Sequence, residues 1–344
     1  MKDYLIVGFG LAGLNIAQEL TERKKSYQII DNGYFNASQV AGGVLNPLIL
    51  KRFTKVWKAD EFLPVALVRY RHIENQLQEH FLHKTPIYRK IKSIQEQNDW
   101  FVAADKPSLA TYMTPALQQL QQLPSALQYG EIQKSWLLDT EKMLSLSRAQ
   151  HLDNGTLTTE NFSYSELKIH PDFIAYKKYK ARKIIFCEGI QLQQNPYFKA
   201  LPLIGNKGEY LLLKIPGLQV KKIIKTALAL IPLGNDYYKF GATYSRAYRD
   251  TQPEEQSLQF LLEKLKQITT LPYTVVDQVT GVRPTVLDRR PFIGAHHRYD
   301  RLLILNGLGS HGILMAPLAA KWLLEFDLDG TPLPKAVNVQ RYPK

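Results

Sequence analysis

Short apolar runs and amphipathic segments alternate at both ends of the chain. Near the N-terminus, residues 4–7 predict a buried strand, and residues 11–23 carry apolar side chains at helical spacing. Residues 27–30 predict a second buried strand. Near the C-terminus, residues 302–305 predict a strand and residues 311–324 a helix. This alternation is typical of an α/β unit, in which helices cover a parallel sheet.

The middle of the chain mixes the two patterns. We expect further helices over residues 61–81, 115–123, 140–150 and 254–268. We expect further strands over residues 100–103, 183–186, 210–213, 228–231, 237–240 and 274–280. Strand-rich segments therefore interrupt the α/β pattern. This order indicates a nucleotide-binding domain with a second, β-rich domain inserted into it, so that the fold is α/β in part and α+β overall.

Composition agrees with an ordinary globular protein. The 344 residues are 45% hydrophobic and 22% charged, which excludes wholesale disorder and suggests two structural units. The 44 basic residues exceed the 31 acidic residues by 13. This excess favours anionic partners such as carboxylates, phosphates, nucleic acid or a membrane surface, without choosing among them.

Cysteine content and the N-terminal sequence limit the class of protein further. Cys187 is the single cysteine, which excludes a disulfide framework and a cysteine-rich metal site and fits a reducing compartment. The apolar stretch over residues 4–20 contains three glycines and several polar residues, so it predicts neither a membrane span nor a cleaved signal peptide. We therefore expect a cytoplasmic protein without a transmembrane segment or a bound metal. The oligomeric state stays open.

A glycine-rich turn joins the first predicted strand to the first predicted helix. It contains Gly8, Gly10, Leu11, Ala12 and Gly13 in the order of a dinucleotide-binding fingerprint. The glycines permit a tight turn, approach of the backbone to a pyrophosphate, and close packing of helix on strand. Asp31 follows 18 residues after the last glycine, where an acid accepts hydrogen bonds from ribose hydroxyls and disfavours NADP. NAD and FAD remain open at this point.

Three other segments carry candidate cofactor contacts. The loop after the second strand has small residues and paired glycines that allow backbone to lie against a planar ring. A turn before the last helix would place that helix N-terminus where negative charge develops on a reduced flavin. In the latter turn we favour a cofactor contact or a structural role for His311 over a catalytic one. The candidate cofactor residues of these segments and of the end of the strand over residues 183–186 are Ser38, Ala41, Gly42, Gly43, Val44, Glu188, Gly189, Gly307, Gly309, Ser310, His311, Gly312 and Ile313.

Together these motifs resemble those of the D-amino-acid oxidase and glycine oxidase family of FAD-dependent oxidoreductases. The similar segments, in the family's order, are residues 8–31, 37–47, 183–189, 241–243, 281–284, 288–294 and 307–317. The resemblance implies a Rossmann-like FAD-binding domain that is discontinuous in sequence and a β-rich substrate domain. We assign residues 1–82, 139–203 and 283–344 to the former, and residues 83–138 and 204–282 to the latter.

The resemblance also implies a reaction. A small carboxylate-bearing amine or amino acid would be oxidised at its C–N bond by hydride transfer to flavin N5, and oxygen or another acceptor would reoxidise the flavin. In the family, the arginine of the motif around Arg283 grips the substrate carboxylate. A guanidinium suits this task because its paired donors fix a carboxylate and it stays charged when desolvated. The alternative is an internal ion pair, for instance with Asp288.

Two departures from the family leave the substrate open. Glycine oxidase-like proteins carry a tyrosine at a position that Ala229 occupies here, and Tyr244 or Tyr238 are candidates to replace it. Asn46 and Tyr244 join Arg283 as candidate substrate contacts. Some relatives attach the flavin through a cysteine, whereas Cys187 falls in a predicted buried strand, so we expect noncovalent FAD.

Two alternatives remain. Residues 241–246 and 308–312 also resemble the flavin half of the enzyme that acts on carboxymethylaminomethyl-uridine in tRNA, a substrate with the same amine and carboxylate. The positive charge agrees with tRNA, but no basic stripe with interleaved aromatics extends beyond residues 176–180, so we do not favour it. The other alternative is a flavin-binding protein without turnover.

Overall fold

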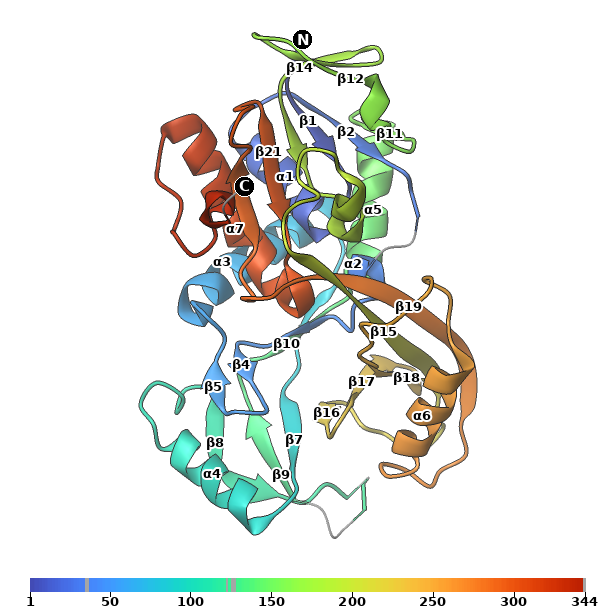
Figure 1. Cartoon of the computed structure of the whole chain (residues 1–344). Coiled ribbons are helices and arrows are strands. Elements are labelled where there is room, and N and C mark those ends of the chain that lie inside the picture. The colour runs from blue at the N-terminus through green and yellow to red at the C-terminus, as the bar shows by residue number, and fades with distance from the viewer. Residues whose placement is uncertain (35–36, 122, 125–127, 343–344) are drawn as a thin grey trace.

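Two eight-stranded sheets organise the chain. The structure is a computed structural model that describes residues 1–34, 37–121, 123–124 and 128–342. Figure 1 shows the first sheet and its helices in the upper half of the view and the second sheet in the lower half. Among the described residues, no helix has both the length and the apolar character that a membrane crossing requires.

The first sheet is built from both ends of the chain and one middle segment. Its neighbouring strands β11, β2, β1, β14 and β21 run parallel, and β12, β13 and β20 add antiparallel neighbours. The strands are β1 Lys2–Val7, β2 Tyr27–Asp31, β11 Leu157–Thr159, β12 Leu167–Ile169, β13 Ile174–Tyr176, β14 Tyr179–Phe186, β20 Phe292–Ala295 and β21 Leu302–Asn306. The helices that accompany them are α1 Leu11–Glu22, α3 Ala59–Leu77, α5 Thr140–Asp153 and α7 Gly312–Asp329. The buried parallel strands confirm the α/β interpretation of both chain ends.

The second sheet has the order β19-β15-β18-β17-β16-β7-β9-β8 and is antiparallel except between β16 and β7. Its strands are β7 Ile87–Ile91, β8 Met113–Gln118, β9 Gln128–Ile132, β15 Leu203–Lys214, β16 Ile223–Lys225, β17 Ala229–Gly234, β18 Tyr237–Gly241 and β19 Thr274–Val286. Helices α4 Ile94–Ala104 and α6 Glu255–Leu265 lie beside it (Figure 1). This is the β-rich part that the sequence predicts, and the exact domain boundaries stay a prediction.

Short elements connect the two sheets. Helix α2 Ala37–Val40 lies against β19, where a Cβ on Gly281 would come within 3.1 Å of the Ala37 Cα. The remaining strands form a three-stranded sheet and a hairpin: β3 Val44–Leu45, β6 Leu82–Lys84, β10 Trp136–Leu138, β4 Leu48–Ile49 and β5 Thr54–Lys55.

Two predicted elements are wrong. Residues 100–103, expected as a strand, belong to α4, because Trp100 is fully buried on one side of that helix against Gly130 of β9. Residues 115–118 of the helix expected over residues 115–123 lie instead in β8, and residue 122 is outside the described residues. Pro115 is compatible with a strand here because β8 is at the edge of the sheet, where a missing N–H breaks no ladder.

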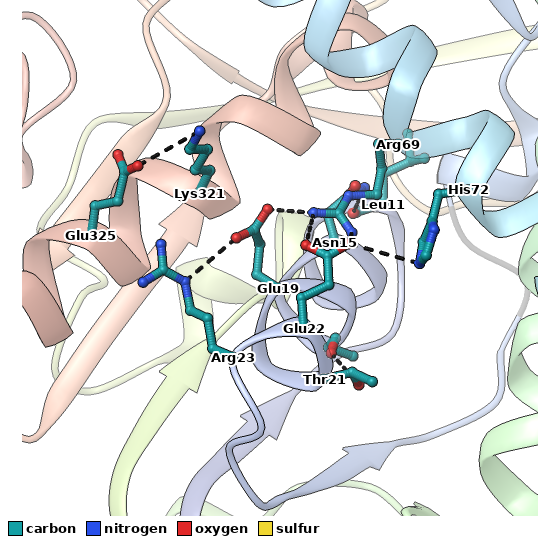
Figure 2. Close-up of polar contacts among 11 residues, drawn as sticks. Leu11, Asn15, Glu19, Thr21, Glu22, Arg23, Arg69, His72, Lys321 and Glu325 are labelled. Carbon is teal, nitrogen blue, oxygen red and sulfur yellow. Dashed lines mark hydrogen bonds and ion pairs between the residues drawn. The ribbon is translucent and has the colours of Figure 1, made fainter.

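A buried arginine joins α3 to α1. Arg69, only 7% exposed, donates to Glu22 Oε1 at 2.5 Å and to the carboxylate of Glu19, which is equally buried. Figure 2 shows this guanidinium between the two carboxylates, with Arg23 approaching Glu19 from the other side. Burial raises the pKa of Glu19, although Arg69 opposes that effect. The ion pairs therefore stabilise a carboxylate that the helix interface would otherwise disfavour.

We expect Arg69→Met to lower the free energy of unfolding by about 3 kcal/mol, because Glu19 would stay buried without its guanidinium partner. Urea unfolding at neutral pH measures this difference. Arg71→Met, on an exposed face of the same helix, is the matched control and should change stability by less than about 0.5 kcal/mol. Equal effects of the two substitutions on the free energy of unfolding would show that the buried ion pair contributes no more to stability than an exposed arginine does.

Candidate functional site

A cavity of about 1020 Å³ lies between the two sheets. Nearly every residue that the sequence analysis nominates as a cofactor or substrate contact lines it. Gly13, Gly307 and Tyr238 are the nominated residues outside its wall. Segments far apart in sequence thus meet around one space, whereas the individual roles stay predictions. The nominated residues that line the cavity are Gly8, Gly10, Leu11, Ala12, Asp31, Ser38, Ala41, Gly42, Gly43, Val44, Asn46, Glu188, Gly189, Tyr244, Arg283, Gly309, Ser310, His311, Gly312 and Ile313.

The glycine fingerprint sits where β1, β14 and α1 converge. Gly8 has φ +97°, and a Cβ there would lie 2.5 Å from the carbonyl oxygen of Cys187. A Cβ on Gly13 would lie 2.0 Å from the carbonyl oxygen of Gly8, so this glycine sets how closely α1 packs on the strand. Gly10, the N-cap of α1, provides no side-chain cap. The N–H of Leu11 donates to Ser38 Oγ at 3.2 Å, and this helix N-terminus lines a site that favours an anion.

Asp31 stabilises the glycine fingerprint by a hydrogen bond and also lines the cavity. Its carboxylate accepts from the backbone N–H of Phe9 at 2.8 Å and of Gly33 at 2.9 Å, and it pairs with Arg148. Glu160 directly follows β11, and its backbone N–H donates to the carbonyl of Asp31. It also lines the cavity, and its buried Oε1 has no hydrogen-bond partner among the described residues. The sequence analysis missed Glu160. Either carboxylate can accept from a ribose hydroxyl at this end of the cavity.

The loop after α2 passes tightly between the two sheets. A Cβ on Gly42 would lie 2.7 Å from Ile231 Cδ1 and 2.8 Å from Tyr210 Oη. Gly43 has φ +71°, and its Cβ would lie 2.2 Å from the carbonyl oxygen of Leu138. Only glycine fits at both positions, which leaves bare backbone exposed to the cavity. The side-chain amide of Asn46 donates to the carbonyl of Leu48 and accepts from the N–H of Leu48, so it stabilises the turn that follows.

Helix α7 points its N-terminus at the same cavity. A 3-10 turn over Gly309–His311 precedes it, and Asn306 ties this region to the 3-10 helix Gly189–Gln194 after β14 by donating to the carbonyl of Gly189 at 3.0 Å. Burial, together with the nearby Arg289, lowers the pKa of His311, so this side chain is neutral at pH 7. A neutral histidine adds no charge to the site. The backbone N–H groups of the helix therefore provide its positive potential here.

Glu188 is a buried acid in the cavity wall. It accepts from the Tyr164 hydroxyl and from Asn195 Nδ2 at 2.8 Å. Burial raises its pKa to about 7 despite these two hydrogen bonds. Burial also raises the pKa of the neighbouring Cys187 thiol, which keeps it protonated and unreactive. This inert thiol agrees with a noncovalently held cofactor.

Arg283 enters the cavity from β19 without an acidic partner. Its Nη1 donates to Asn206 Oδ1 at 3.2 Å, and it forms no ion pair with the residues that the structure describes. Gly208 on β15 provides the space, because a Cβ there would lie 2.2 Å from Arg283 Nη2. Asp288, the alternative partner, pairs with Arg341 at 3.0 Å instead. The guanidinium thus presents free donors to the cavity.

The two tyrosines nominated to replace the family tyrosine lie in different environments. Tyr244 is 64% exposed at the cavity rim. Tyr238 is buried in the core of the second sheet, where its hydroxyl accepts from Val220 N, and it is absent from the cavity wall. The suggestion of Tyr238 is therefore wrong. Tyr210, which the sequence analysis placed in a strand without a role, lies beside the cofactor loop.

These features fit FAD. The cavity has an anion-binding helix N-terminus at Gly10, two acids at one end, and bare glycine backbone at Gly42 and Gly43. The pyrophosphate fits at the helix N-terminus, the adenosine ribose beside the two acids, and a flat ring system against the glycine backbone. Arg283 then lies on the substrate side, across β15 from the glycine loop.

Comparisons with known proteins agree with this arrangement. The family model for FAD dependent oxidoreductases, called DAO, matches residues 3–326. Glycine oxidase from Bacillus licheniformis is 30% identical over 106 residues, which are 30% of this chain and 28% of that relative. The crystal structure of glycine oxidase from Geobacillus kaustophilus superposes with a TM-score of 0.83 at 17% identity, covering 100% of this chain and 99% of that one. For iminodiacetate oxidase from Chelativorans sp. BNC1 the TM-score is 0.79 at 17% identity, with coverage of 97% and 99%.

We expect Gly8→Ala to weaken FAD binding at least about ten-fold, because the new Cβ would collide with the Cys187 carbonyl and open the fingerprint. Titration of the apoprotein with FAD, followed by flavin fluorescence, measures the dissociation constant. Gly155→Ala is the matched control, since Gly155 also has positive φ (+65°) but open space around its Cβ. It should cost about 1 kcal/mol of stability and leave FAD affinity unchanged. If both substitutions leave the affinity unchanged, the fingerprint does not hold the cofactor.

Glu188 should make stability depend on pH. Its pKa rises from 4.5 to about 7 on folding, so the folded protein binds a proton that the unfolded chain has released. The free energy of unfolding should fall between these two pH values as pH rises and then level off. Glu188→Gln should remove this slope, which amounts to at most about 3 kcal/mol. Urea unfolding at pH 5 and 8 tests this, with the exposed Glu166→Gln as control; an unchanged slope in Glu188→Gln contradicts it.

Proposed function

Because this chain belongs to the DAO family of FAD-dependent oxidoreductases, we propose that it oxidises the C–N bond of a small amine that carries a carboxylate. The enzyme binds FAD noncovalently, and family membership makes it an oxidoreductase rather than a flavin-binding protein without turnover. The proposal adds the substrate class, the reacting bond and the residues involved. It includes oxygen or another acceptor as oxidant, and a cytoplasmic location.

The free guanidinium of Arg283 is the observation that carries the proposal. Among the described residues its one hydrogen-bond acceptor is the neutral amide of Asn206, and Gly208, which has no Cβ, makes room for the guanidinium. A charged group without a counterion in a cavity binds a complementary anion well. A carboxylate is the complementary group because both its oxygens meet the paired guanidinium donors.

The chain's own residues provide binding and orientation. Arg283 fixes the carboxylate, so the adjacent α-carbon is held toward the loop at Gly42 and Gly43. Ile231 and Tyr210 close this side against the loop and limit the space around the reacting carbon. When bound, FAD supplies the acceptor for the hydride that leaves the α-carbon. The N-terminus of α7 would favour negative charge at the cofactor, and the imine product would hydrolyse in water.

The names of the relatives support the same substrate class. Glycine and iminodiacetate, the substrates named for two relatives, are both amines with a carboxylate on the neighbouring carbon. The match to the curated glycine oxidase covers 28% of that protein, so its own substrate is not transferred. We propose only the shared chemistry.

A second candidate, carboxymethylaminomethyl-uridine in tRNA, has one observation in its favour. The exposed Lys51 lines both the main cavity and a neighbouring hollow that also contains Arg52, Lys92 and Lys106. Acidic Glu96 and Asp99 share that hollow, so it is not a purely basic surface. Salt-sensitive tRNA binding would favour this candidate, and its absence at low salt would remove it.

Anaerobic addition of glycine, sarcosine, proline and a panel of D-amino acids tests the proposal. At least one of them should bleach the flavin absorbance of the wild-type enzyme. For that substrate, we expect Arg283→Met to lower kcat/KM by about 100-fold, because a charge-assisted bidentate contact is lost. Arg246→Met, exposed and outside the cavity wall, is the matched control and should leave kcat/KM unchanged. Flavin that stays oxidised with every small amine, or an active Arg283→Met enzyme, would refute the proposal.

A further inference from the structure

We propose that Lys225 is a second anion-binding residue of the substrate cavity, so that the preferred substrate carries a second acidic group, a carboxylate or a phosphate, remote from the carboxylate on Arg283. This inference rests on the proposed function and narrows its substrate class. It concerns the part of the cavity formed by the second sheet, away from the fingerprint.

The register of the second sheet puts Lys225 on the same face as the substrate arginine. Lys225 pairs with Ala229, Ala229 with Gly241, and Gly241 with Tyr210. Directly opposed residues in antiparallel strands point to the same face, and all four line the cavity. Gly208 is two residues from Tyr210 and so shares this face, and the Arg283 guanidinium covers its Cα. The two cations therefore border one continuous surface.

Three small residues and the ring of Tyr210, which lies over Gly241, occupy the surface between the two cations. Gly208, Gly241 and Ala229 carry at most a methyl group, and each lines the cavity. From β15 to β16 there are three strand spacings, or about 14 Å, before either side chain reaches inward. An extended substrate can lie across this floor with one anion at each end. Ala229, which is paired with Lys225, presents only a methyl group and leaves the path to Lys225 open.

Lys225 has no counterion in the part of the chain that the structure describes. Its Nζ donates to the carbonyl of Ala227 at 3.1 Å and forms no ion pair there. The neighbouring cations are Arg89, directly opposite on β7, and Lys92, and Arg89 already pairs with Glu96. Burial and these two like charges lower the pKa of Lys225 to about 8. At pH 7 the amine is still mostly protonated, and an anion bound beside it relieves the repulsion.

The pyrophosphate of FAD is not the anion in question. We assign that group to the N-terminus of α1, which packs against the first sheet. Lys225 lies on β16, on the far side of Ile231, which packs toward the cofactor loop at Gly42. The anion at Lys225 must therefore come with the substrate.

Binding of substrate-free acids to the FAD-loaded enzyme tests this inference at pH 7. Flavin difference spectra report the dissociation constants of the diacids from malonate to pimelate and of the monoacids from propionate to heptanoate. At the best length, the diacid should bind the wild-type enzyme at least about ten-fold more tightly than the monoacid with the same number of carbons. Phosphonoacetate and phosphonopropionate extend the series, and the tighter of the two diacid classes identifies the second group as carboxylate or phosphate.

Three variants connect the preference to the residue. Lys225→Met should abolish the diacid preference and leave monoacid binding unchanged, whereas Lys225→Arg should retain it. Lys221→Met, exposed in the same segment and outside the cavity wall, is the matched control. Equal affinities of diacids and monoacids for the wild-type enzyme, or a preference that survives in Lys225→Met, would overturn the inference.

Failure of the proposed function gives a different result. In that case Arg283→Met would leave monoacid binding unchanged and no amine would reduce the flavin. If the inference alone fails, Arg283→Met still weakens monoacids, and Lys225→Met changes neither acid class.

Discussion

The closeness of backbone to backbone at the fingerprint is the constraint on which the rest of the structure depends. Gly8 brings β1 against the end of β14, and Gly13 brings α1 onto the carbonyl of Gly8. Because neither position has room for a Cβ, the helix begins directly at the carboxyl end of the parallel strands. Its N–H groups and the acids that follow β2 and β11 then line the same cavity. Cofactor binding is thus a consequence of how the sheet and helix meet.

The second sheet completes the cavity from the opposite side. Strands β15 and β19 run from this sheet toward the first one (Figure 1), and they carry Gly208 and Arg283. The glycine loop at Gly42 and Gly43 fills the space between the sheets so tightly that Ile231 and Tyr210 touch it. A substrate on the second sheet must therefore lie next to a cofactor held by the first. In the proposed reaction, this juxtaposition is the main contribution of the chain, because it orients the substrate against the cofactor.

Two kinds of group provide positive charge to the cavity. At the cofactor end, helix N-termini provide positive potential, and the neutral His311 adds none. At the substrate end, side-chain cations do so, with Arg283 and Lys225 both lacking carboxylate partners among the described residues. Arg69, by contrast, is buried and paired with Glu19 (Figure 2). The net charge of +13 is therefore less informative about the site than these two cavity cations, which have no carboxylate partner among the described residues.

The sequence by itself predicted most of the local elements and nominated the residues of the cofactor half. The fingerprint, Asp31, the paired glycines and the turn before α7 are contiguous motifs, and short-range sterics alone restrict which residues such turns accept. Only the tertiary structure decided that residues 113–118 form strand β8 beside β9. It also decided that Asp31 pairs with Arg148, and that Arg283 has Asn206 rather than Asp288 as its partner. It also decided the row from Tyr210 to Lys225, because the register between strands sets which side chains share a face. Register depends on packing between segments distant in sequence, and no single segment of the chain contains it.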